Sequence, residues 1–440
     1  MTSGSETDHS SQQIAIIGQG YVGLPLALLF VKKAHTVYGI DVDPGKIEAL
    51  RNGKSYLPDV KEEEILSSLA TGRYYPTDRF EKVKEANAII ICVPTPLNSS
   101  HSPDLTILEK AILEVGKNLR KGQLVILESS TYPGTTREIL QPVLELESGL
   151  TAGIDFHIGY SPERIDPGNE NYKVEQIPKI ISGLTKQCAV CAQALYSSVF
   201  EKVVTVSSPD VAELTKLLEN SYRFINISFM NEIAAICDKM NIDVWEVIEA
   251  AKTKPFGFTA FYPGPGIGGH CIPVDPLYLQ WRANKFGIES KFIQLSHEVN
   301  RSIPYYMVNR VKALLSRQSE LQHDRILIYG VAYKKDINDV RESPALDLIR
   351  LLVEAGMSVS YHDPYIPEIQ VDGTAYKSVP INDEMLRRTD CVIIFTDHSA
   401  IPVEQIVTHA PIVFDTRNVT AGMHSKHHVY RLGAGLGTLN

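Results

Sequence analysis

The feature that most constrains this chain is a glycine-rich turn between an apolar strand-like segment and a helical one. Residues 14–17 form a short continuous apolar run, typical of a buried parallel strand, and Gly18, Gly20 and Gly23 follow at once. In this spacing the first glycine makes the tight turn, the second lets the backbone approach a pyrophosphate, and the third lets the helix pack on the strand. The helix start then offers N–H groups to the phosphates. The pattern therefore predicts a dinucleotide-binding unit.

A carboxylate about twenty residues further on indicates which dinucleotide is bound. The second apolar segment, residues 35–40, ends at Asp41. An acidic side chain there accepts hydrogen bonds from the ribose hydroxyls and repels a 2′-phosphate, which favours NAD over NADP. The alternative is a purely structural strand-to-helix turn, which the glycines alone would also allow.

Strand-like and helical segments continue to alternate through the first half of the chain. The strand-like segments are residues 88–93, 124–129 and 156–159, and the helical patterns include residues 105–119 and 136–146. This alternation predicts a doubly wound α/β domain, whose functional loops lie at the carboxyl ends of the strands. Three loops that carry hydroxyls or a carboxylate follow these strands, at residues 93–96, 128–135 and 160–164. Taken singly, each loop is also explained by a structural role.

The middle of the chain is predicted to be helical. A 3.6-residue periodicity runs from residue 211 to residue 240, which is long for a globular helix and suggests a spine between domains or a dimer interface. Lys216 and Asn220 share one face of this helix by their spacing. An exposed charged face is the plain alternative, but Arg223 extends the polar positions down the helix, which favours a lined pocket.

One cysteine lies in a second glycine-rich stretch, residues 264–275. Glycines around Cys271 let the backbone come close to a ligand, and a carboxylate, Asp275, follows four residues later. The thiolate is the reactive form of cysteine, and backbone N–H groups at a turn or helix start favour it. The alternative is a tight loop around a buried core cysteine.

Strands and helices alternate again in the last third of the chain. The strand-like segments are residues 325–331, 358–362, 391–395 and 411–415, with a helical pattern at residues 343–354. This second α/β domain has no dinucleotide fingerprint of its own. Lys334, Arg341 and Arg417 fall near the strand ends, where they could hold a phosphorylated ligand or be surface charge.

Length and composition set the outer limits. At 440 residues the chain is too long for one ordinary core, and we expect a disordered leader (residues 1–12), an NAD-binding domain (13–206), a central helical region with the cysteine loop (207–312) and a C-terminal α/β domain (313–440). The net charge of −9 argues against a nucleic-acid binder. Without a membrane-length apolar run or a hydrophobic signal core, we expect no membrane association and a cytoplasmic location.

The six cysteines predict neither a disulfide framework nor a metal site. Cys188 and Cys191 have CxxC spacing, but no second pair matches them and they fall in a helical pattern. No other metal-ligand spacing is present, so no metal is expected.

An NAD-binding fold joined to a loop cysteine suggests a particular oxidation. NAD takes a hydride from an alcohol, the cysteine captures the aldehyde as a thiohemiacetal, and a second oxidation gives a thioester that water cleaves to an acid. A dehydrogenase that stops at the aldehyde or ketone would not need Cys271. A non-catalytic NAD-binding scaffold would be expected to lack Lys216, Cys271 or Asp275, and all three are present.

The same residues carry a resemblance to a known family. From about residue 13 to residue 432 the chain resembles the UDP-sugar 6-dehydrogenases. The shared motifs are GxGxxG with Asp41, Val93-Pro94-Thr95-Pro96, Ser130-Thr131 before Pro133-Gly134-Thr135, Lys216-Leu217-x-Glu219-Asn220, Gly268-Gly269-His270-Cys271 with Asp275, Lys334-Lys335-Asp336 and Arg341-Glu342-Ser343. The resemblance implies NAD as cofactor, a UDP-sugar substrate bound through the second α/β domain, and a homodimer or higher homo-oligomer built on the long helix.

The resemblance also implies roles for individual residues. The catalytic set would be Cys271 as nucleophile, Lys216 for the oxyanion at the sugar C6, Asn220 for positioning the sugar, Asp275 and Thr131 for the water, and Glu163 for hydrolysis of the thioester. The NAD-binding set would be Gly18, Gly20, Tyr21, Val22, Gly23, Asp41, Lys46, Pro94, Thr95, Thr131 and Arg341. The substrate-binding set would be Glu163, Arg164, Lys216, Asn220, Arg223, Phe261, Tyr262, Gly264, Gly268, Lys334 and Arg417, with Arg223 expected to contact the polar substituents of the sugar.

Departures from the UDP-glucose pattern point to an acetylated sugar. Pro167 stands where that branch has a second glutamate, and His270 and Val274 replace its serine and lysine around the cysteine. The stretch from His270 resembles the branch that oxidises UDP-N-acetylhexosamines, and residues 253–264 are most like the UDP-N-acetylglucosamine 6-dehydrogenases. The mannosamine epimer is the alternative, UDP-glucose is a further one, and the role of His270 stays open.

Overall fold

The computed structural model describes residues 11–57, 59–98, 102–164, 173–269, 271–316, 325–423 and 428–435. The chain divides into two compact units. The first unit comprises Met1–Glu219 and Leu277–Gly287, and the second comprises Asn220–Pro276 and Ile288–Asn440. Most of the predicted leader, and also Pro167 and His270, lie outside the described residues.

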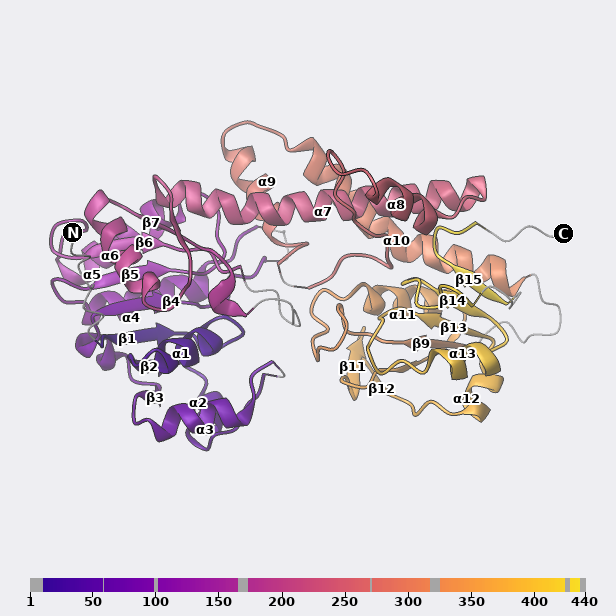
Figure 1. Ribbon diagram of the computed structural model, residues 1–440, viewed down its shortest axis with the longest axis horizontal. Coiled ribbons are helices and arrows are strands. Elements are labelled where there is room, and N and C mark those ends of the chain that lie inside the picture. Colours follow the sequence, from indigo (N-terminus) through magenta and orange to yellow (C-terminus); the bar gives the residue numbers. More distant parts are fainter. Residues whose placement is uncertain are drawn as a thin grey trace, which may run out of the picture. The chain divides into compact units, whose positions relative to one another are not determined.

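The first unit is built on an eight-stranded sheet in the order β3-β2-β1-β4-β5-β6-β7-β8 (Figure 1). The strands are β1 (Gln13–Ile17), β2 (Thr36–Ile40), β3 (Tyr74–Thr77), β4 (Ala88–Ile91), β5 (Leu124–Leu127), β6 (His157–Tyr160), β7 (Lys179–Gly183) and β8 (Val203–Thr205). All neighbouring pairs run parallel except β6 and β7, which are antiparallel. The order reverses at β1, which lies between β2 and β4, and ligands of open α/β sheets bind at such a switch point.

Helices of the first unit follow the strands. They are α1 (Gly23–Lys32), α2 (Pro44–Arg51), α3 (Glu62–Ala70), α4 (Thr106–Asn118), a π-helical turn (Thr136–Leu140) that continues into α5 (Gln141–Ser148), and α6 (Lys186–Ser197), with 3₁₀ turns at Phe80–Glu85 and Val174–Gln176. α1 is apolar almost throughout and packs with α3 and α6 against Ile14 and Ile16 of the central strand. Because β1 is buried on both faces, it shows the unbroken apolar run seen in the sequence.

The helical part of the chain contains four longer elements. These are α7 (Pro209–Met240), α8 (Val244–Lys252), α9 (Asp275–Lys285) and α10 (Lys291–Leu315). α7 confirms the long helix expected from the periodicity, and boundaries between the two units fall inside the sequence of α7 and of α9. Asp243 caps α8 by accepting a hydrogen bond from the Trp245 N–H, which ends the preceding turn and starts the helix.

The second unit contains a five-stranded parallel sheet in the order β10-β9-β13-β14-β15 (Figure 1). Its strands are β9 (Arg325–Tyr329), β10 (Ser358–His362), β13 (Cys391–Ile394), β14 (Val413–Asp415) and β15 (Val429–Arg431), beside a hairpin of β11 (Glu368–Val371) and β12 (Thr374–Lys377). Ile326 and Ile328 pack with α10 and α11 (Pro344–Glu354), whereas Leu327 and Tyr329 pack with α12 (Asp383–Arg388) and α13 (Val403–His409). Alternate residues of the central strand therefore serve two helical layers.

These two α/β sheets and the long helices confirm the predicted fold class. The short strands β3, β7, β8, β11, β12 and β15 and the helices α2, α3, α12 and α13 were not expected from the sequence. Every helix among the described residues is too short or too polar to cross a bilayer.

Candidate active site

The glycine turn of the first unit leaves space where a ligand would lie. Gly18 has a φ of +91°, and a Cβ there would lie 2.7 Å from the Cys92 carbonyl oxygen. A Cβ on Gly23 would lie 1.8 Å from the Gly18 carbonyl oxygen, so both positions require glycine for the fold itself. At Gly20, in contrast, a Cβ would meet no described atom within 4 Å. The glycine in the middle of the turn thus borders open space.

Asp41 lies beside this turn at the end of β2. Its Oδ2 accepts a hydrogen bond from the Gln19 N–H at 2.8 Å, its Oδ1 accepts from the Asp43 N–H at 3.0 Å, and Lys46 Nζ lies 3.4 Å from Oδ2. These contacts fix the carboxylate against the glycine turn. Lys46, which the sequence assigned to NAD binding, neutralises this carboxylate in the structure.

Gln19 is a residue of this turn that the sequence analysis missed. Its side chain is fully buried, donates to the Ile16 carbonyl at 3.0 Å and accepts from the Tyr74 hydroxyl at 2.8 Å. Gln19 stands at a variable position of GxGxxG, so the motif itself does not indicate a role for it. Its partner Tyr74 belongs to β3, a strand that the sequence did not predict. Tyr21 and Val22, in the same turn, pack partly buried against the core.

The features around this turn fit NAD. The first turn of α1 contains no acidic side chain, so nothing on that turn repels a phosphate at the helix N-terminus. Open space at Gly20 and a fixed carboxylate at Asp41 provide for the pyrophosphate and the ribose hydroxyls.

The loops after β4 and β5 are tied to each other. The Thr95 hydroxyl donates to the Ser130 carbonyl at 2.6 Å, and the Ser129 hydroxyl donates to the Val93 carbonyl at 2.7 Å. Tyr278 of α9 donates its hydroxyl to the Thr95 carbonyl at 2.7 Å, while Pro94 stays exposed. The Thr131 hydroxyl is buried and has no hydrogen-bond partner within the described residues. A buried, unpaired hydroxyl is costly unless it serves a ligand or a water.

Glu213 of α7 anchors the segment that follows Thr131. The buried carboxylate accepts hydrogen bonds from the Gly134 N–H at 2.6 Å, the Thr136 N–H at 2.9 Å and the Thr136 hydroxyl at 2.6 Å. Burial raises the pKa of Glu213 to about 7. Lys216 follows one turn later on α7 and is buried to 8% exposure. The sequence analysis missed Glu213 because its partners are nearly eighty residues away along the chain.

The loop after β6 carries Glu163 and Arg164. Arg164 forms a bidentate ion pair with Glu219, with Nη2–Oε1 at 2.7 Å and Nε–Oε2 at 3.2 Å, and also donates to the Pro178 carbonyl. Arg164 was expected to bind substrate, and here its guanidinium is held by protein groups. Lys179 Nζ lies 3.5 Å from Glu163 Oε2.

In the second unit, Cys271 is exposed and stands at the start of α9. The Asp275 N–H donates to the Cys271 carbonyl at 2.9 Å, which ties the cysteine turn to the first turn of the helix. The Asp275 carboxylate is almost fully buried and accepts a hydrogen bond from Asn220 Nδ2 at 2.6 Å. The structure therefore brings together three of the predicted catalytic residues, and it presents the one thiol among them to solvent.

The glycine loop before Cys271 is docked on the α/β domain of the second unit. Asn300 binds Ile267 twice, accepting from its N–H at 2.8 Å and donating to its carbonyl at 3.2 Å. A Cβ on Gly268 would lie 2.6 Å from the Glu342 carbonyl oxygen, and a Cβ on Gly264 would lie 2.8 Å from Arg417 Nη1. The glycines are therefore needed for close packing, and Arg417 lies against the loop.

Other predicted substrate residues of the second unit have defined neighbours. Phe261 packs edge-to-face on Tyr222, with ring centroids 5.6 Å apart. Tyr262 stacks on Trp245 and donates its hydroxyl to Glu249 Oε1 at 2.8 Å. Arg223 is half-buried on α7.

The basic residues of the second α/β domain differ in their surroundings. Arg341, predicted to contact NAD, is ion-paired with Asp339 at 2.6 Å. Lys334 lies on the loop after β9, and the same loop is fixed where the Asp336 N–H donates to the buried His398 at 3.0 Å. Within the described residues no cluster of His, Cys, Asp and Glu could hold a metal ion.

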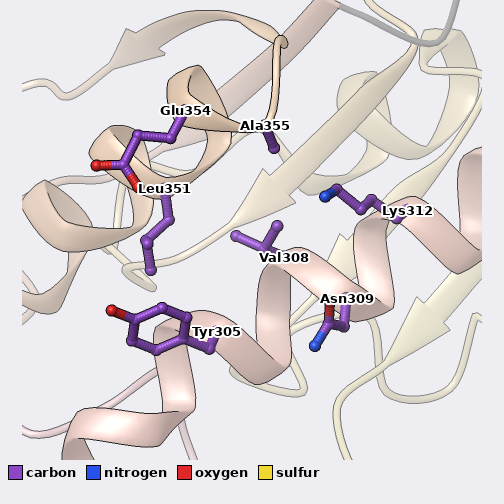
Figure 2. Close-up of a pocket in the computed structure, with 7 residues that line it drawn as sticks. All are labelled: Tyr305, Val308, Asn309, Lys312, Leu351, Glu354 and Ala355. Carbon is purple, nitrogen blue, oxygen red and sulfur yellow. The ribbon is translucent and has the colours of Figure 1, made fainter.

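A cavity of about 250 Å³ lies elsewhere in the second unit, between α10 and α11. Figure 2 shows Tyr305, Val308, Asn309 and Lys312 on one helix, facing residues of the other. The remaining lining residues are Leu351, Glu354 and Ala355. This lining shares no residue with the predicted catalytic or binding sets.

Comparison with known families covers nearly the whole chain. The NAD-binding domain of the UDP-glucose/GDP-mannose dehydrogenase family matches residues 12–200, the central domain matches residues 210–302, and the UDP-binding domain matches residues 327–422. The chain belongs to this family. The predicted resemblance and the NAD cofactor are thereby confirmed, and the dehydrogenase family defines a UDP-binding domain in the second unit.

Individual members of the UDP-glucose/GDP-mannose dehydrogenase family are similar over most of their length. UDP-N-acetyl-D-glucosamine 6-dehydrogenase of Pseudomonas aeruginosa is 39% identical over 80% of this chain and 83% of the relative. UDP-N-acetyl-D-mannosamine dehydrogenase of Methanococcus maripaludis is 32% identical over 94% of each chain. The solved structure of a UDP-D-ManNAc dehydrogenase from Pyrococcus horikoshii superposes with a TM-score of 0.87 at 31% identity, covering 97% of this chain and 100% of the other.

Proposed function

We propose that this dehydrogenase oxidises the C6 alcohol of UDP-N-acetylglucosamine to the uronic acid in two successive oxidations. The observation that carries the proposal is the exposed Cys271, held at the start of α9 beside the buried Asp275–Asn220 pair. A dehydrogenase that releases an aldehyde has no use for a thiol presented in this way. NAD, when bound, accepts one hydride from C6 in each oxidation.

The chain's own residues account for the remaining chemistry. Cys271 Sγ adds to the aldehyde carbon to give a thiohemiacetal, which becomes a thioester once the second hydride has left. Water then attacks C6, the C6–Sγ bond breaks, and the electron pair returns to sulfur. The sum is one alcohol, one water and two NAD giving one carboxylic acid, two NADH and two protons.

The roles proposed here are those that the family resemblance implies, and they agree with the charge and hydrogen-bonding capacity of each side chain. Lys216 is proposed to stabilise negative charge on the C6 oxygen, since a cation placed beforehand lowers the barrier without reorganising. Asn220 and Asp275 hold the reacting group and the water, supported by their mutual hydrogen bond. The unpaired Thr131 hydroxyl is proposed to bind that water, and Glu163 to accept its proton.

The UDP half is proposed to bind the second α/β domain through Lys334 and Arg417. Arg417 donates from Nε to the Phe395 carbonyl at 2.9 Å, which orients its guanidinium beside Gly264. The glycine there leaves room that a side chain would take, so the loop and the arginine can approach one ligand together.

The choice of sugar rests on similarity. The most identical of the named relatives above oxidises UDP-N-acetyl-D-glucosamine by its name, and the stretch around residues 253–264 resembles that branch. UDP-N-acetylmannosamine is the second candidate, because relatives named for it match 94% of the chain. The two sugars differ only in the direction of the acetamido group at C2.

The first experiment measures NADH formed per sugar consumed with UDP-N-acetylglucosamine, UDP-N-acetylmannosamine and UDP-glucose in parallel. Two NADH per molecule of the first sugar and little reaction of the others is the expected result. Two NADH with another sugar would move the specificity and keep the mechanism. One NADH per sugar would reject the four-electron reaction.

Cys271→Ser tests the nucleophile directly. A hydroxyl does not form the thioester efficiently, so acid production should fall at least about a hundredfold while NAD binding stays unchanged. Cys191→Ser, at a half-buried cysteine of α6, is the matched control and should behave like the native protein. Equal acid production by Cys271→Ser would overturn the proposal.

We also propose a homodimer formed through α7. Seven large apolar residues of this helix are exposed, namely Val211, Leu214, Leu218, Tyr222, Phe229, Ile236 and Met240. At about 100° per residue they fall within an arc of about 80°, so they form one stripe along the helix. We call this set the α7 stripe. An apolar stripe of this length favours burial against a second copy.

A further inference from the structure

The first unit contains a buried ionic cluster that includes Glu163. It consists of Lys179, Glu128 and Glu163, with Tyr196 and Phe200 around the lysine. Glu128 and Lys179 belong to none of the predicted site sets.

Sheet topology explains why the lysine lies there. Glu128 directly follows β5, and Glu163 lies in the loop after β6, so both stand at the carboxyl ends of parallel strands. β7 runs antiparallel to β6, and its first residue is Lys179. The amino end of β7 therefore meets the carboxyl end of β6, which brings the ammonium to the functional edge of the sheet.

The contacts of Lys179 connect two carboxylates. Its Nζ lies 2.9 Å from Glu128 Oε2 and 3.5 Å from Glu163 Oε2. The ammonium also lies 5.2 Å from the centre of the Tyr196 ring and 5.4 Å from that of Phe200. The Tyr196 hydroxyl donates to Glu128 Oε1, which leaves Glu128 tied on both oxygens.

Exposure increases outward from the cluster's centre toward Glu163. The side chains of Glu128 and Lys179 are 0% and 4% exposed, and that of Glu163 is 12% exposed. Taking a lysine and a glutamate out of water costs several kcal/mol per ion, and apolar residues of the same volume often serve stability equally well. Lys179 is buried with Glu128 and also contacts Glu163, which is more accessible. This arrangement therefore suggests a function beyond stability.

We propose that Lys179, backed by Glu128, is a positioning residue that holds the Glu163 carboxylate in the orientation needed for hydrolysis of the Cys271 thioester. The inference rests on the proposed function, in which Glu163 takes the proton of the attacking water. The water oxygen bonds to C6, its proton passes to Glu163, the C6–Sγ bond breaks, and Cys271 leaves as the thiolate. Glu163 afterwards returns the proton to sulfur or to solvent.

The charges around Glu163 support this assignment. Arg164, the neighbouring cation, is already neutralised by Glu219. Burial raises the pKa of Glu128 to about 7, so near neutral pH this carboxyl can take up a proton and leave the Lys179 charge to Glu163. Tyr196 contacts the cluster and Cys92 interacts with it electrostatically; both are buried, and burial raises the pKa of both, so they stay neutral.

The test is a double-mutant cycle between Lys179→Met and Glu163→Gln in the full-length protein. The readouts are kcat, KM for the UDP-sugar, and the fraction of protein that carries a covalent sugar, measured by intact mass during turnover. Lys179→Met should lower kcat about tenfold to a hundredfold, change KM less than about threefold, and raise the adduct fraction. The double variant should be no slower than Glu163→Gln alone, because Lys179 acts only through Glu163.

Two further variants separate positioning from folding. Tyr196→Phe removes a hydrogen bond from Glu128 but keeps the Lys179–Glu163 contact, so it should lower the melting temperature without raising the adduct fraction. Glu128→Gln removes the charge behind Lys179 but keeps a polar partner for it, so it should lower kcat less than Lys179→Met does and flatten the pH dependence of kcat between about pH 6 and 8. The inference would be overturned if the losses in kcat of Lys179→Met and Glu163→Gln multiplied in the double variant. An unchanged adduct fraction in Lys179→Met would overturn it as well.

Failure of the proposed function gives a different pattern. In that case the native protein forms no covalent sugar adduct, or Glu163→Gln by itself leaves kcat and the adduct fraction unchanged. If Glu163→Gln does slow hydrolysis, only the behaviour of Lys179→Met decides whether the lysine positions it.

Discussion

Burial raises the pKa of two glutamates of the first unit, Glu128 and Glu213, and the effect of Glu213 is open to measurement. Its carboxylate accepts three hydrogen bonds from the segment after Thr131, yet burial still raises its pKa to about 7. An ordinary glutamate in the unfolded chain has a pKa near 4.3. The folded protein therefore holds a proton on Glu213 over a range of pH in which the unfolded chain has lost it.

This difference predicts a pH-dependent stability. Stability contributed by the protonated Glu213 is complete below about pH 4.3 and is lost as the pH rises to about 7, by about 4 kcal/mol in all. Glu213→Gln should lack this slope. Urea unfolding at pH 5 and pH 8, followed by Trp281 fluorescence in a Trp245→Phe background, measures the first unit, because Trp281 packs on Tyr132. Equal slopes with and without Glu213 would contradict the prediction.

At the scale of elements, the loop before Cys271 shows how packing places a reactive group. Gly268 has an ordinary φ, so its requirement for glycine comes from neighbours and not from its backbone conformation. Its Cβ would lie 2.6 Å from the Glu342 carbonyl oxygen, 2.8 Å from Tyr333 Cβ and 2.9 Å from Pro344 Cδ. Two of these contacts involve backbone or ring atoms that cannot simply turn aside.

We expect Gly268→Ala to push the loop away from the α/β domain. Turnover should fall by at least about tenfold, because a displacement of about 1 Å near the chemistry costs that much or more. NAD binding should change much less in calorimetry, because the glycine turn and Asp41 of the first unit are untouched. Gly287→Ala is the matched control, since its Cβ meets no described atom within 4 Å and only its φ of +72° is unfavourable. Full turnover in Gly268→Ala would show that the loop adapts.

Elements also show where sequence reasoning succeeds and where it stops. The GxGxxG turn, Asp41 and the cysteine loop were predictable because each is a local pattern whose chemistry depends on nearby residues. Lys179 and Glu213 were not, because their roles come from the reversed direction of β7 and from contacts far along the chain. The ion pair between Arg164 and Glu219 was not predictable either, because the two residues lie far apart along the chain. The proposed residue roles and domain bounds stay predictions.

At the scale of the whole molecule, the family supplies two nucleotide-binding domains with different duties. The NAD-binding domain carries the glycine turn with open space at Gly20, while the UDP-binding domain has a basic loop and no such turn. The predicted nucleophile, Cys271, belongs to neither sheet, because it lies in the turn before α9. Its position therefore depends on the helices that connect the two nucleotide-binding domains. In the single chain the apolar side chains of the α7 stripe are exposed to solvent.

The α7 stripe predicts the assembly state. Phe229 lies near its middle and is 55% exposed, so Phe229→Lys would place a charge inside a dimer interface at a cost of several kcal/mol. Sedimentation velocity should find the native protein near twice its chain mass of 48.9 kDa and the variant near that mass. Val190→Lys on α6 is the matched control, because Val190 has the same exposed fraction and lies off the stripe. A native monomer, or a Phe229→Lys variant that is still a dimer, would contradict a dimer interface on the α7 stripe. The exposed apolar residues would then be covered by something other than a second copy of the chain.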